Sequence, residues 1–262
     1  MNHLTVDIET IPAQRPDVLE EIRAIEQSAL DYGLANIKPP GNYKKQETID
    51  EWMANEAPKQ AQALKDAFDA NVDAAYRKTG LDGAFGQVCA IGIAFNDQAP
   101  TVLSVADWQR LDAEALLLSD FAELLHEVIP PRFDLQTCVV GHNVAGFDLR
   151  FLAQRSIVHG VQPHTVIARA AQAKPWETDK VFDTMVQWAG IGKTISLDKL
   201  CNALGLPRKG GITGADVWPM VQDGKIQEVA DYCAQDVIKT RMVHQRMTFR
   251  QVVQPEFEDV PA

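Results

Sequence analysis

The stretch that decides the fold lies near the start of the chain and reads Leu4-Thr5-Val6-Asp7-Ile8-Glu9-Thr10. Side chains alternate between the two faces of a β-strand, so the apolar residues at positions 4, 6 and 8 share one face, while Asp7 and Glu9 share the other. Two carboxylates this close repel each other, and no basic residue lies between them. A divalent cation would relieve the repulsion. A half-buried surface strand with an acidic outer face explains the same stretch without a metal.

The composition is that of a globular protein with a sizeable core. The chain has 262 residues, of which 46% are hydrophobic, and a formal net charge of −11. This net negative charge argues against a protein that binds along duplex DNA through positive charge. It does not argue against an enzyme that binds one strand end through metal cations. The acidic start of the chain and the absence of a long apolar run predict no signal peptide and no membrane partner, so we expect a cytoplasmic protein.

The cysteines stand alone in largely apolar surroundings, without the paired spacing of a zinc or redox motif. This pattern predicts buried, reduced thiols and excludes a disulfide scaffold. The residues concerned are Cys89, Cys138, Cys201 and Cys233.

The segment after the first strand has helical spacing of its apolar residues. One amphipathic stretch runs over Pro16–Leu34, with acids in its first turn. Thr48, followed three residues later by Glu51, has the spacing of a capping box and predicts the start of a second helix. Helical spacing continues over Ala61–Tyr76. We therefore expect an all-helical insertion over residues of about 13–86.

The remainder alternates between strand and helix patterns. Strands are expected at 88–95, 101–105 and 137–140, and helices at 112–129, from about 147 to 160, at 196–204 and at 226–247. Three antiparallel strands, then a strand that returns after a helix, predict an α/β fold with a mixed sheet flanked by helices. We expect a single domain over residues 1–250 and a polar C-terminal tail over 251–262.

Further acids stand where such folds place functional sites. Asp148 opens a helix directly after a strand, in a turn that also contains Asn143. Tyr232 and Asp236 are four residues apart on the last helix, so they share one face, and flanking apolar residues draw that face toward the core. Asp148 also suits an ordinary helix start, and Tyr232 an ordinary core position. A buried aspartate at position 236 needs a partner.

Three motifs together resemble the exonuclease motifs of the DEDD superfamily, in its tyrosine-bearing branch: Asp7-Ile8-Glu9, then Asn143 through Phe147-Asp148, then Tyr232-Cys233-Ala234-Gln235-Asp236. The likeness is closer still to stand-alone predicted 3′-5′ exonucleases related to the proofreading domain of family B DNA polymerases, often found in phages and prophages. It covers most of the chain, including the helical insertion. It implies a ribonuclease H-like fold and hydrolysis of phosphodiester bonds from the 3′ end of single-stranded nucleic acid, with DNA favoured.

The resemblance also implies a site for two divalent cations, Mg²⁺ or Mn²⁺, which prefer hard oxygen ligands. Asp7 would bridge both ions, and Glu9 and Asp148 would each complete one site in part. Asp236 would hold the ion that carries the attacking water, and Tyr232 would orient that water. A tyrosine hydroxyl, with an ordinary pKa of about 10, is a poor base at neutral pH.

Substrate contacts implied by the resemblance involve Thr10, Asn143 and Phe147. Thr10 is otherwise an ordinary strand-end residue, and Asn143 either closes its turn or touches substrate. Two rival carboxylates, Asp183 and Asp231, are expected at a strand end and away from the metal face, respectively. Basic clusters with aromatic or flexible neighbours either line a groove that binds the nucleic-acid strand or are ordinary solvated surface residues. These clusters are Lys38, Lys44 and Lys45 with Tyr43, and Arg208-Lys209, which leads into a glycine-rich loop expected over Gly210–Gly214.

Two other functions compete with the nuclease. A phosphatase with Asp7 as nucleophile usually has a second aspartate two residues on, where Glu9 stands here. A catalytically inactive nucleic-acid-binding or replisome-binding module would keep the same fold, and the presence of all the motif carboxylates argues against it. Such a module would have replication or repair proteins as partners, and the sequence identifies no particular protein partner.

Overall fold

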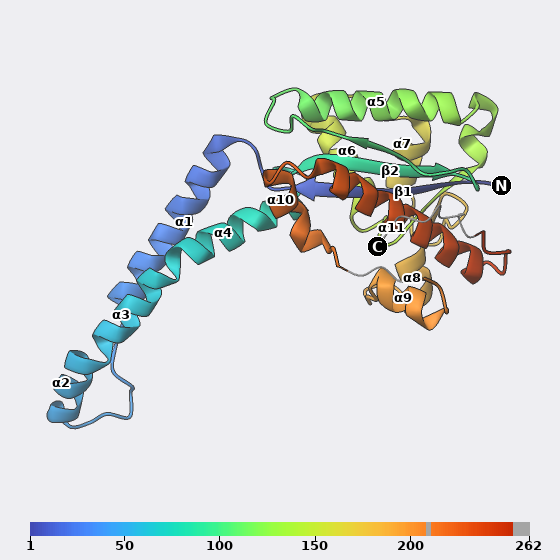
Figure 1. The fold of residues 1–262 in the computed structure, drawn as a ribbon. Coiled ribbons are helices and arrows are strands. Elements are labelled where there is room, and N and C mark those ends of the chain that lie inside the picture. The colour runs from blue at the N-terminus through green and yellow to red at the C-terminus, as the bar shows by residue number, and fades with distance from the viewer. Residues whose placement is uncertain (208–210, 254–262) are drawn as a thin grey trace.

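The structure is a computed structural model that describes residues 1–207 and 211–253 (Figure 1). Its centre is a five-stranded sheet in the order β3-β2-β1-β4-β5. The strands are β1 (Asn2–Ile11), β2 (Gln87–Phe95), β3 (Thr101–Ser104), β4 (Thr137–Gly141) and β5 (Val181–Asp183). β1, β2 and β3 pair antiparallel, whereas β4 and β5 continue the sheet in parallel to β1. The predicted mixed sheet is therefore confirmed.

Helices cover both faces of the sheet (Figure 1). The apolar face of β1 packs with α5 (Ala113–Val128), α6 (Asp148–His159) and α7 (Thr165–Ala171) in the main hydrophobic core. The acidic face of β1 lies toward α11 (Ile226–Met247) and α10 (Gly214–Gln222), which close a second core over β1 and β2. Two short helices, α8 (Thr184–Ala189) and α9 (Leu197–Ala203), extend this layer, and α9 packs on α11 through Leu200 and Met242.

Four helices form an arm that projects from the body (Figure 1). They are α1 (Pro16–Ala35), α2 (Gln46–Asn55), α3 (Ala57–Asp66) and α4 (Phe68–Lys78), followed by a 3₁₀ turn at Thr79–Leu81. α1 leads outward, α2 lies at the far end, and α3 and α4 return beside α1. At about 1.5 Å per residue the twenty-residue α1 alone reaches about 30 Å.

The arm is tied to β1 where the two ends of the arm meet. The hydroxyl of Thr10 donates to the carbonyl of Gly80 at 2.6 Å, and Ala13 N–H donates to Thr79 Oγ1 at 2.9 Å. The Tyr76 hydroxyl donates to the Ala13 carbonyl at 2.8 Å. A Cβ on Gly80 would lie 3.2 Å from the β1 backbone, so a glycine allows this close approach. The base of the arm is thus fixed against the end of β1.

Several helix boundaries differ from the sequence prediction. α2 begins at Gln46 after Lys45, so Thr48 lies inside the helix and does not cap it. The helical stretch expected over 61–76 is interrupted at Ala67, between α3 and α4. The helices α7 and α10 were not anticipated, although a Thr213–Asp216 capping box begins α10 within the glycine-rich segment. Local glycine content had favoured a loop there.

Some sequence predictions concern residues outside the described part of the chain. These are the basic pair Arg208-Lys209, Gly210 of the glycine-rich loop, and residues 254–262 of the tail. Within the described residues, no helix has the length and apolar character needed to cross a membrane.

Candidate metal centre

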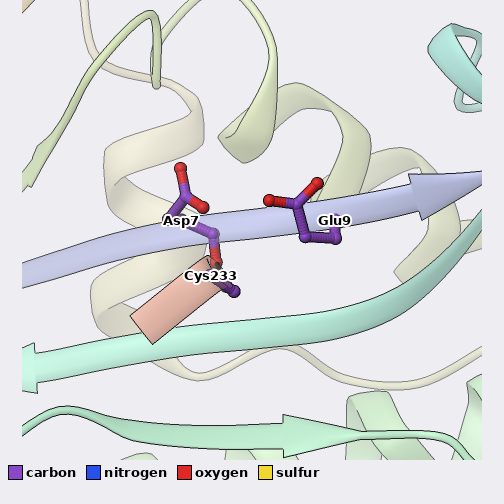
Figure 2. A group of neighbouring side chains, drawn as sticks. All are labelled: Asp7, Glu9 and Cys233. Atoms are coloured by element: carbon purple, nitrogen blue, oxygen red, sulfur yellow. Dashed lines mark hydrogen bonds between the residues drawn. The ribbon is translucent and has the colours of Figure 1, made fainter. Parts of the chain in front are cut away.

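Asp7 and Glu9 leave β1 on the same side, as the strand alternation predicts (Figure 2). Asp7 is half-buried, with its carboxylate enclosed by neighbouring groups, and Glu9 is buried. In the described residues, ligand atoms of Asp7, Glu9 and Cys233 all lie within 4.8 Å of one another. β1 therefore presents two carboxylates to one small volume next to α11.

Asp148 reaches β1 from the first turn of α6. Its Oδ1 accepts a hydrogen bond from the N–H of Ile8 at 3.1 Å. The pairing of β4 with β1 ends at Thr5 and Val140, so the Asp148 carboxylate takes the place of a strand partner at Ile8. Because Ile8 lies between Asp7 and Glu9, this bond fixes a third carboxylate beside the acidic pair.

Asp183 organises the turn that leads to Asp148. It lies at the end of β5, and its carboxylate accepts from the N–H groups of Asn143 and Ala145, both at 3.0 Å, and from that of Met185 at 3.0 Å. Asn143 adopts a left-handed backbone conformation, with φ of 63°, which asparagine tolerates better than most residues. Asp183 is thus a buried strand-end residue with its hydrogen bonds satisfied, as expected, and Asn143 closes the turn.

α11 approaches the acidic face closely because a glycine lies beneath it. Gly92 of β2 pairs with Asp7, and a Cβ on Gly92 would lie 2.8 Å from Cys233 Sγ. The Cys233 thiol contacts the Asp7 carbonyl at 3.5 Å. This packing brings the helix that carries Tyr232 and Asp236 over Asp7. Asp231 is exposed and bonds to Gln227 on the same helix.

The charges on these elements act on one another. Burial, followed by the negative charges of Glu9, Asp148 and Asp236, raises the pKa of Asp7 well above its ordinary value. Burial likewise raises the pKa of Asp148 to about 7, although hydrogen bonds from backbone N–H groups oppose this shift. Mutual repulsion of buried carboxylates is relieved by bound cations, and an all-oxygen donor set fits Mg²⁺ or Mn²⁺.

Tyr232 and Cys233 keep their protons in this environment. Burial, then the charges of Asp236, Glu9 and Asp7, raises the pKa of the Tyr232 hydroxyl far above its ordinary value. Burial raises the pKa of the Cys233 thiol in the same way. A protonated thiol is a poor ligand for hard cations, so Cys233 serves packing and the oxygen ligands are the carboxylates.

Lys239 is a member of the site that the sequence interpretation missed. Its ammonium forms an ion pair with Oδ1 of Asp236 at 2.7 Å, although the geometry is not that of a hydrogen bond. A second carboxylate, that of Asp198, lies 3.0 Å from the same ammonium. Burial lowers the pKa of Lys239, but the two carboxylates outweigh this effect and the net shift is upward. The spacing of three residues between Asp236 and Lys239 on one helix was a readable signal for this pair.

A pocket of about 420 Å³ is lined by Glu9, one of the candidate carboxylates. β1 contributes Glu9 and Thr10, the start of α6 contributes Phe147, and α10 contributes Trp218. The base of the arm supplies a further wall with Arg77, Lys78, Gly80 and Leu81. A larger pocket of about 570 Å³ between α6 and α7 has no ionisable lining residue.

The predicted basic cluster of the insertion is not at this pocket. Lys38, Lys44, Lys45 and Tyr43 belong to the segment between α1 and α2, at the far end of the arm (Figure 1). That segment therefore does not line this pocket.

Comparison with known proteins gives one family and one fold. A family model described as "Predicted 3'-5' exonuclease related to the exonuclease domain of PolB" matches residues 80–258. No curated protein matches the chain. The solved family B DNA polymerase from the hyperthermophilic archaeon Pyrobaculum calidifontis is similar in fold, with a TM-score of 0.53 and 16% identity, over 95% of this chain and 24% of the polymerase. The chain thus spans about a quarter of that polymerase's length. The predicted ribonuclease H-like α/β fold agrees with this likeness.

Proposed function

Because the chain belongs to the family of predicted 3′-5′ exonucleases related to the exonuclease domain of PolB, we propose that it is a metal-dependent 3′-5′ exonuclease of the tyrosine-bearing DEDD type. Family membership supports nuclease activity in general. The direction of cleavage and the substrate, the 3′ end of a single nucleic-acid strand with DNA favoured, are part of the proposal. One observation carries it: the charges of Glu9, Asp148 and Asp236 converge on Asp7 from three separate elements.

The proposed cation ligands are Asp7, Glu9, Asp148 and Asp236. When bound, two Mg²⁺ or Mn²⁺ ions supply an activated water and neutralise the charge that develops on the phosphate and on the leaving 3′ oxygen. Asp7 lies at the centre of the group and is the candidate to serve both ions. Asp148 keeps one oxygen on the Ile8 N–H, so this bond fixes the direction of its carboxylate. Lys239, one turn further along α11, forms an ion pair with Asp236 at 2.7 Å.

Tyr232 is proposed to position the attacking water. Its raised pKa keeps the proton on Oη at neutral pH, so the hydroxyl donates or accepts a hydrogen bond and does not act as a base. The water's proton then leaves through solvent or a neighbouring carboxylate. Replacement by phenylalanine should reduce the rate without abolishing it.

The pocket beside Glu9 is proposed to receive the terminal nucleotide. Phe147 and Trp218 offer aromatic surface for a base, and nucleobases stack on such side chains without strong sequence preference. Thr10 uses its hydroxyl for Gly80, which leaves backbone groups as its proposed substrate contact. Asn143 shapes the turn before Asp148, and any contact it makes with substrate would come from the same turn.

A labelled strand tests the proposal. A 5′-labelled single-stranded DNA, incubated with protein and Mg²⁺ or Mn²⁺, should yield a descending ladder, and EDTA should stop the reaction. Release of labelled mononucleotide from the start would mean the opposite direction. A retarded but uncut strand would mean a binding module, and phosphate release from p-nitrophenyl phosphate with an intact strand would mean a phosphatase.

Three variants and one control complete the test. Asp7→Ala and Asp236→Ala should each abolish cleavage, whereas Tyr232→Phe should retain a reduced rate. Asp231→Ala is the matched control, because Asp231 adjoins Tyr232 but is exposed. Full activity of either alanine variant at position 7 or 236 would remove that residue from the site.

A further inference from the structure

The arm contributes positive charge to the pocket of the candidate site. Arg77 and Lys78 form the last turn of α4 and line the same pocket as Glu9 and Thr10. We propose, on the basis of the proposed nuclease function, that Lys78, assisted by Arg77, binds a phosphate on the 5′ side of the scissile bond. The arm would thereby favour a polynucleotide strand over an isolated nucleotide ester.

Lys78 is held in place by its neighbours. Thr79 and Gly80, the next residues, bond to Ala13 and Thr10 at the end of β1. Two residues earlier, Tyr76 packs edge-on against Trp218 of α10, with ring centroids 6.3 Å apart. Since both sides of position 78 are anchored to elements that line the pocket, its side chain starts from a fixed point on the pocket wall.

The charge of Lys78 is available to a ligand. The side chain of Lys78 is exposed and makes no hydrogen bond or ion pair with any residue that the structure describes. Arg77 shares its charge with Asp73 at 2.7 Å. A strand that approaches the acidic group on a chain of net charge −11 meets repulsion, so a cation beside that group offsets part of this cost.

The pocket separates Lys78 from the carboxylates. The scissile phosphate must meet the acids on the β1 wall, whereas Lys78 belongs to the wall made by the arm. A volume of about 420 Å³ lies within the range of about 300–1,000 Å³ for small-molecule sites, so the terminal nucleotide, on the 3′ side of the scissile bond, can occupy this space. The rest of the strand leaves the pocket on the 5′ side of the scissile bond, past the wall made by the arm, where the cation of Lys78 meets its next phosphate.

This contact would be a property of the arm. The family match begins at residue 80, so Arg77 and Lys78 precede it. The arm would thereby take a role in substrate selection that family membership does not imply.

Binding measurements test the contact without relying on turnover. The variants are Lys78→Gln and Lys78→Arg, with Lys65→Gln as the matched control, because Lys65 is an exposed lysine on α3 of the same arm. Fluorescence anisotropy of a labelled single-stranded oligonucleotide with Ca²⁺ gives Kd over a range of KCl concentrations. One lost phosphate contact should lower the magnitude of the slope of log K against log salt by about 0.7 and weaken binding roughly three- to tenfold. Lys78→Arg should restore both values.

Cleavage measurements separate this inference from the proposed function. For Lys78→Gln, kcat/KM should fall roughly three- to tenfold more on the oligonucleotide than on the p-nitrophenyl ester of thymidine 5′-monophosphate, which has no second phosphate. An equal loss on both substrates, or an unchanged salt slope, would overturn the role of Lys78 while wild-type cleavage still supports the nuclease. If the wild type cleaves neither substrate, the proposed function itself fails.

Discussion

Asp7 and Gly92 lie directly opposite each other in the β1–β2 pair, under α11. The missing side chain at Gly92 leaves the space in which Cys233 and Val237 pack, because a Cβ there would lie 2.8 Å from Cys233 Sγ and 2.9 Å from Val237 Cγ2. The distance between α11 and the sheet therefore depends on this glycine. The reach of Tyr232 and Asp236 toward Asp7 depends on the same distance.

Replacing Gly92 by alanine should damage activity more than stability. The added methyl group forces α11 away from β2, which should lower the free energy of unfolding by about 1–3 kcal/mol. A displacement of about 1 Å at the acidic group should lower kcat on the order of a hundredfold. Urea denaturation and the oligonucleotide assay measure the two effects.

Gly41→Ala is the matched control for the Gly92 substitution. A Cβ on Gly41 would meet nothing within 4 Å, so the free energy of unfolding should change by less than about 0.5 kcal/mol. Equal activity of the two alanine variants would show that the spacing of α11 does not depend on Gly92.

Stability without cations should fall as pH rises, and Asp148 should be one source of the fall. Its pKa of about 7 in the folded protein exceeds the value of about 3.9 for aspartate in an unfolded chain. The folded state therefore binds the proton more tightly, so this contribution is complete below about pH 4 and is lost as pH rises to about 7. In EDTA, the difference in unfolding free energy between wild type and Asp148→Asn should decrease over that range.

Added Mg²⁺ should reverse this trend, because cations bind the ionised carboxylates. The increase in Tm caused by MgCl₂ should grow between pH 5 and pH 7.5 and should be much smaller in Asp148→Asn. An increase in Tm that does not vary with pH would show that Asp148 does not take part in cation binding.

Local patterns predicted the elements that present the candidate ligands. The last helix was expected at 226–247 and is found there, since its apolar stripe repeats over many turns. The helix expected from about 147 ends at Gly160, which adopts the left-handed conformation typical of a C-cap. The mixed sheet followed from the order of strands and helices. The two helices are determined by residues close in sequence, whereas the sheet follows from the order in which strand and helix patterns alternate.

Contacts between distant residues were not predictable in the same way. Gly92 reads as one more small residue in a buried strand, and only the packing of α11 reveals that its lack of a side chain matters. The short helix α10 begins in a glycine-rich segment. The glycine content of this segment predicts a loop, although a capping box also marks the start of a helix there. Lys78 reads as an ordinary C-terminal helix cation until the arm is folded back on β1.

Removing the charge of Lys239 should make the protein more dependent on cations. In EDTA, Lys239→Met leaves the largely buried Asp236 without its counter-charge, so the free energy of unfolding should fall by about 1–3 kcal/mol. Saturating Mg²⁺ should then raise Tm more in the variant than in wild type. Thermal unfolding with EDTA and with MgCl₂ measures both effects.

Asp198→Asn is the control for Lys239. It removes the more exposed partner of the lysine and keeps the contact with Asp236, so the loss should stay within about 1 kcal/mol. If Lys239→Met and wild type respond equally to Mg²⁺, the lysine does not compensate for a missing cation at Asp236.

A buried ion pair, remote from the candidate carboxylates, should stabilise the segment that connects the arm to β2. Glu114 of α5 accepts hydrogen bonds from Val88 N–H at 2.8 Å and from Arg155 Nη2 at 2.7 Å, and Arg155 Nη1 donates to the carbonyls of Gly83 and Ala84 at 3.3 and 3.2 Å. These bonds join α5 and α6 to the segment between the arm and β2. Loss of the ion pair between Glu114 and Arg155 should therefore lower the free energy of unfolding without altering the chemistry of the candidate site.

Arg155→Met leaves the carboxylate of Glu114 buried with only the Val88 N–H and His159 beside it, so the free energy of unfolding should fall by about 3–5 kcal/mol. Arg150→Met, on the exposed side of α6, should cost less than about 0.5 kcal/mol. Adding Glu114→Gln to Arg155→Met should recover part of the loss, because the unpaired charge is then gone. Chemical denaturation of the four proteins measures these differences, and equal losses for the two methionine variants would show that the pair contributes nothing specific.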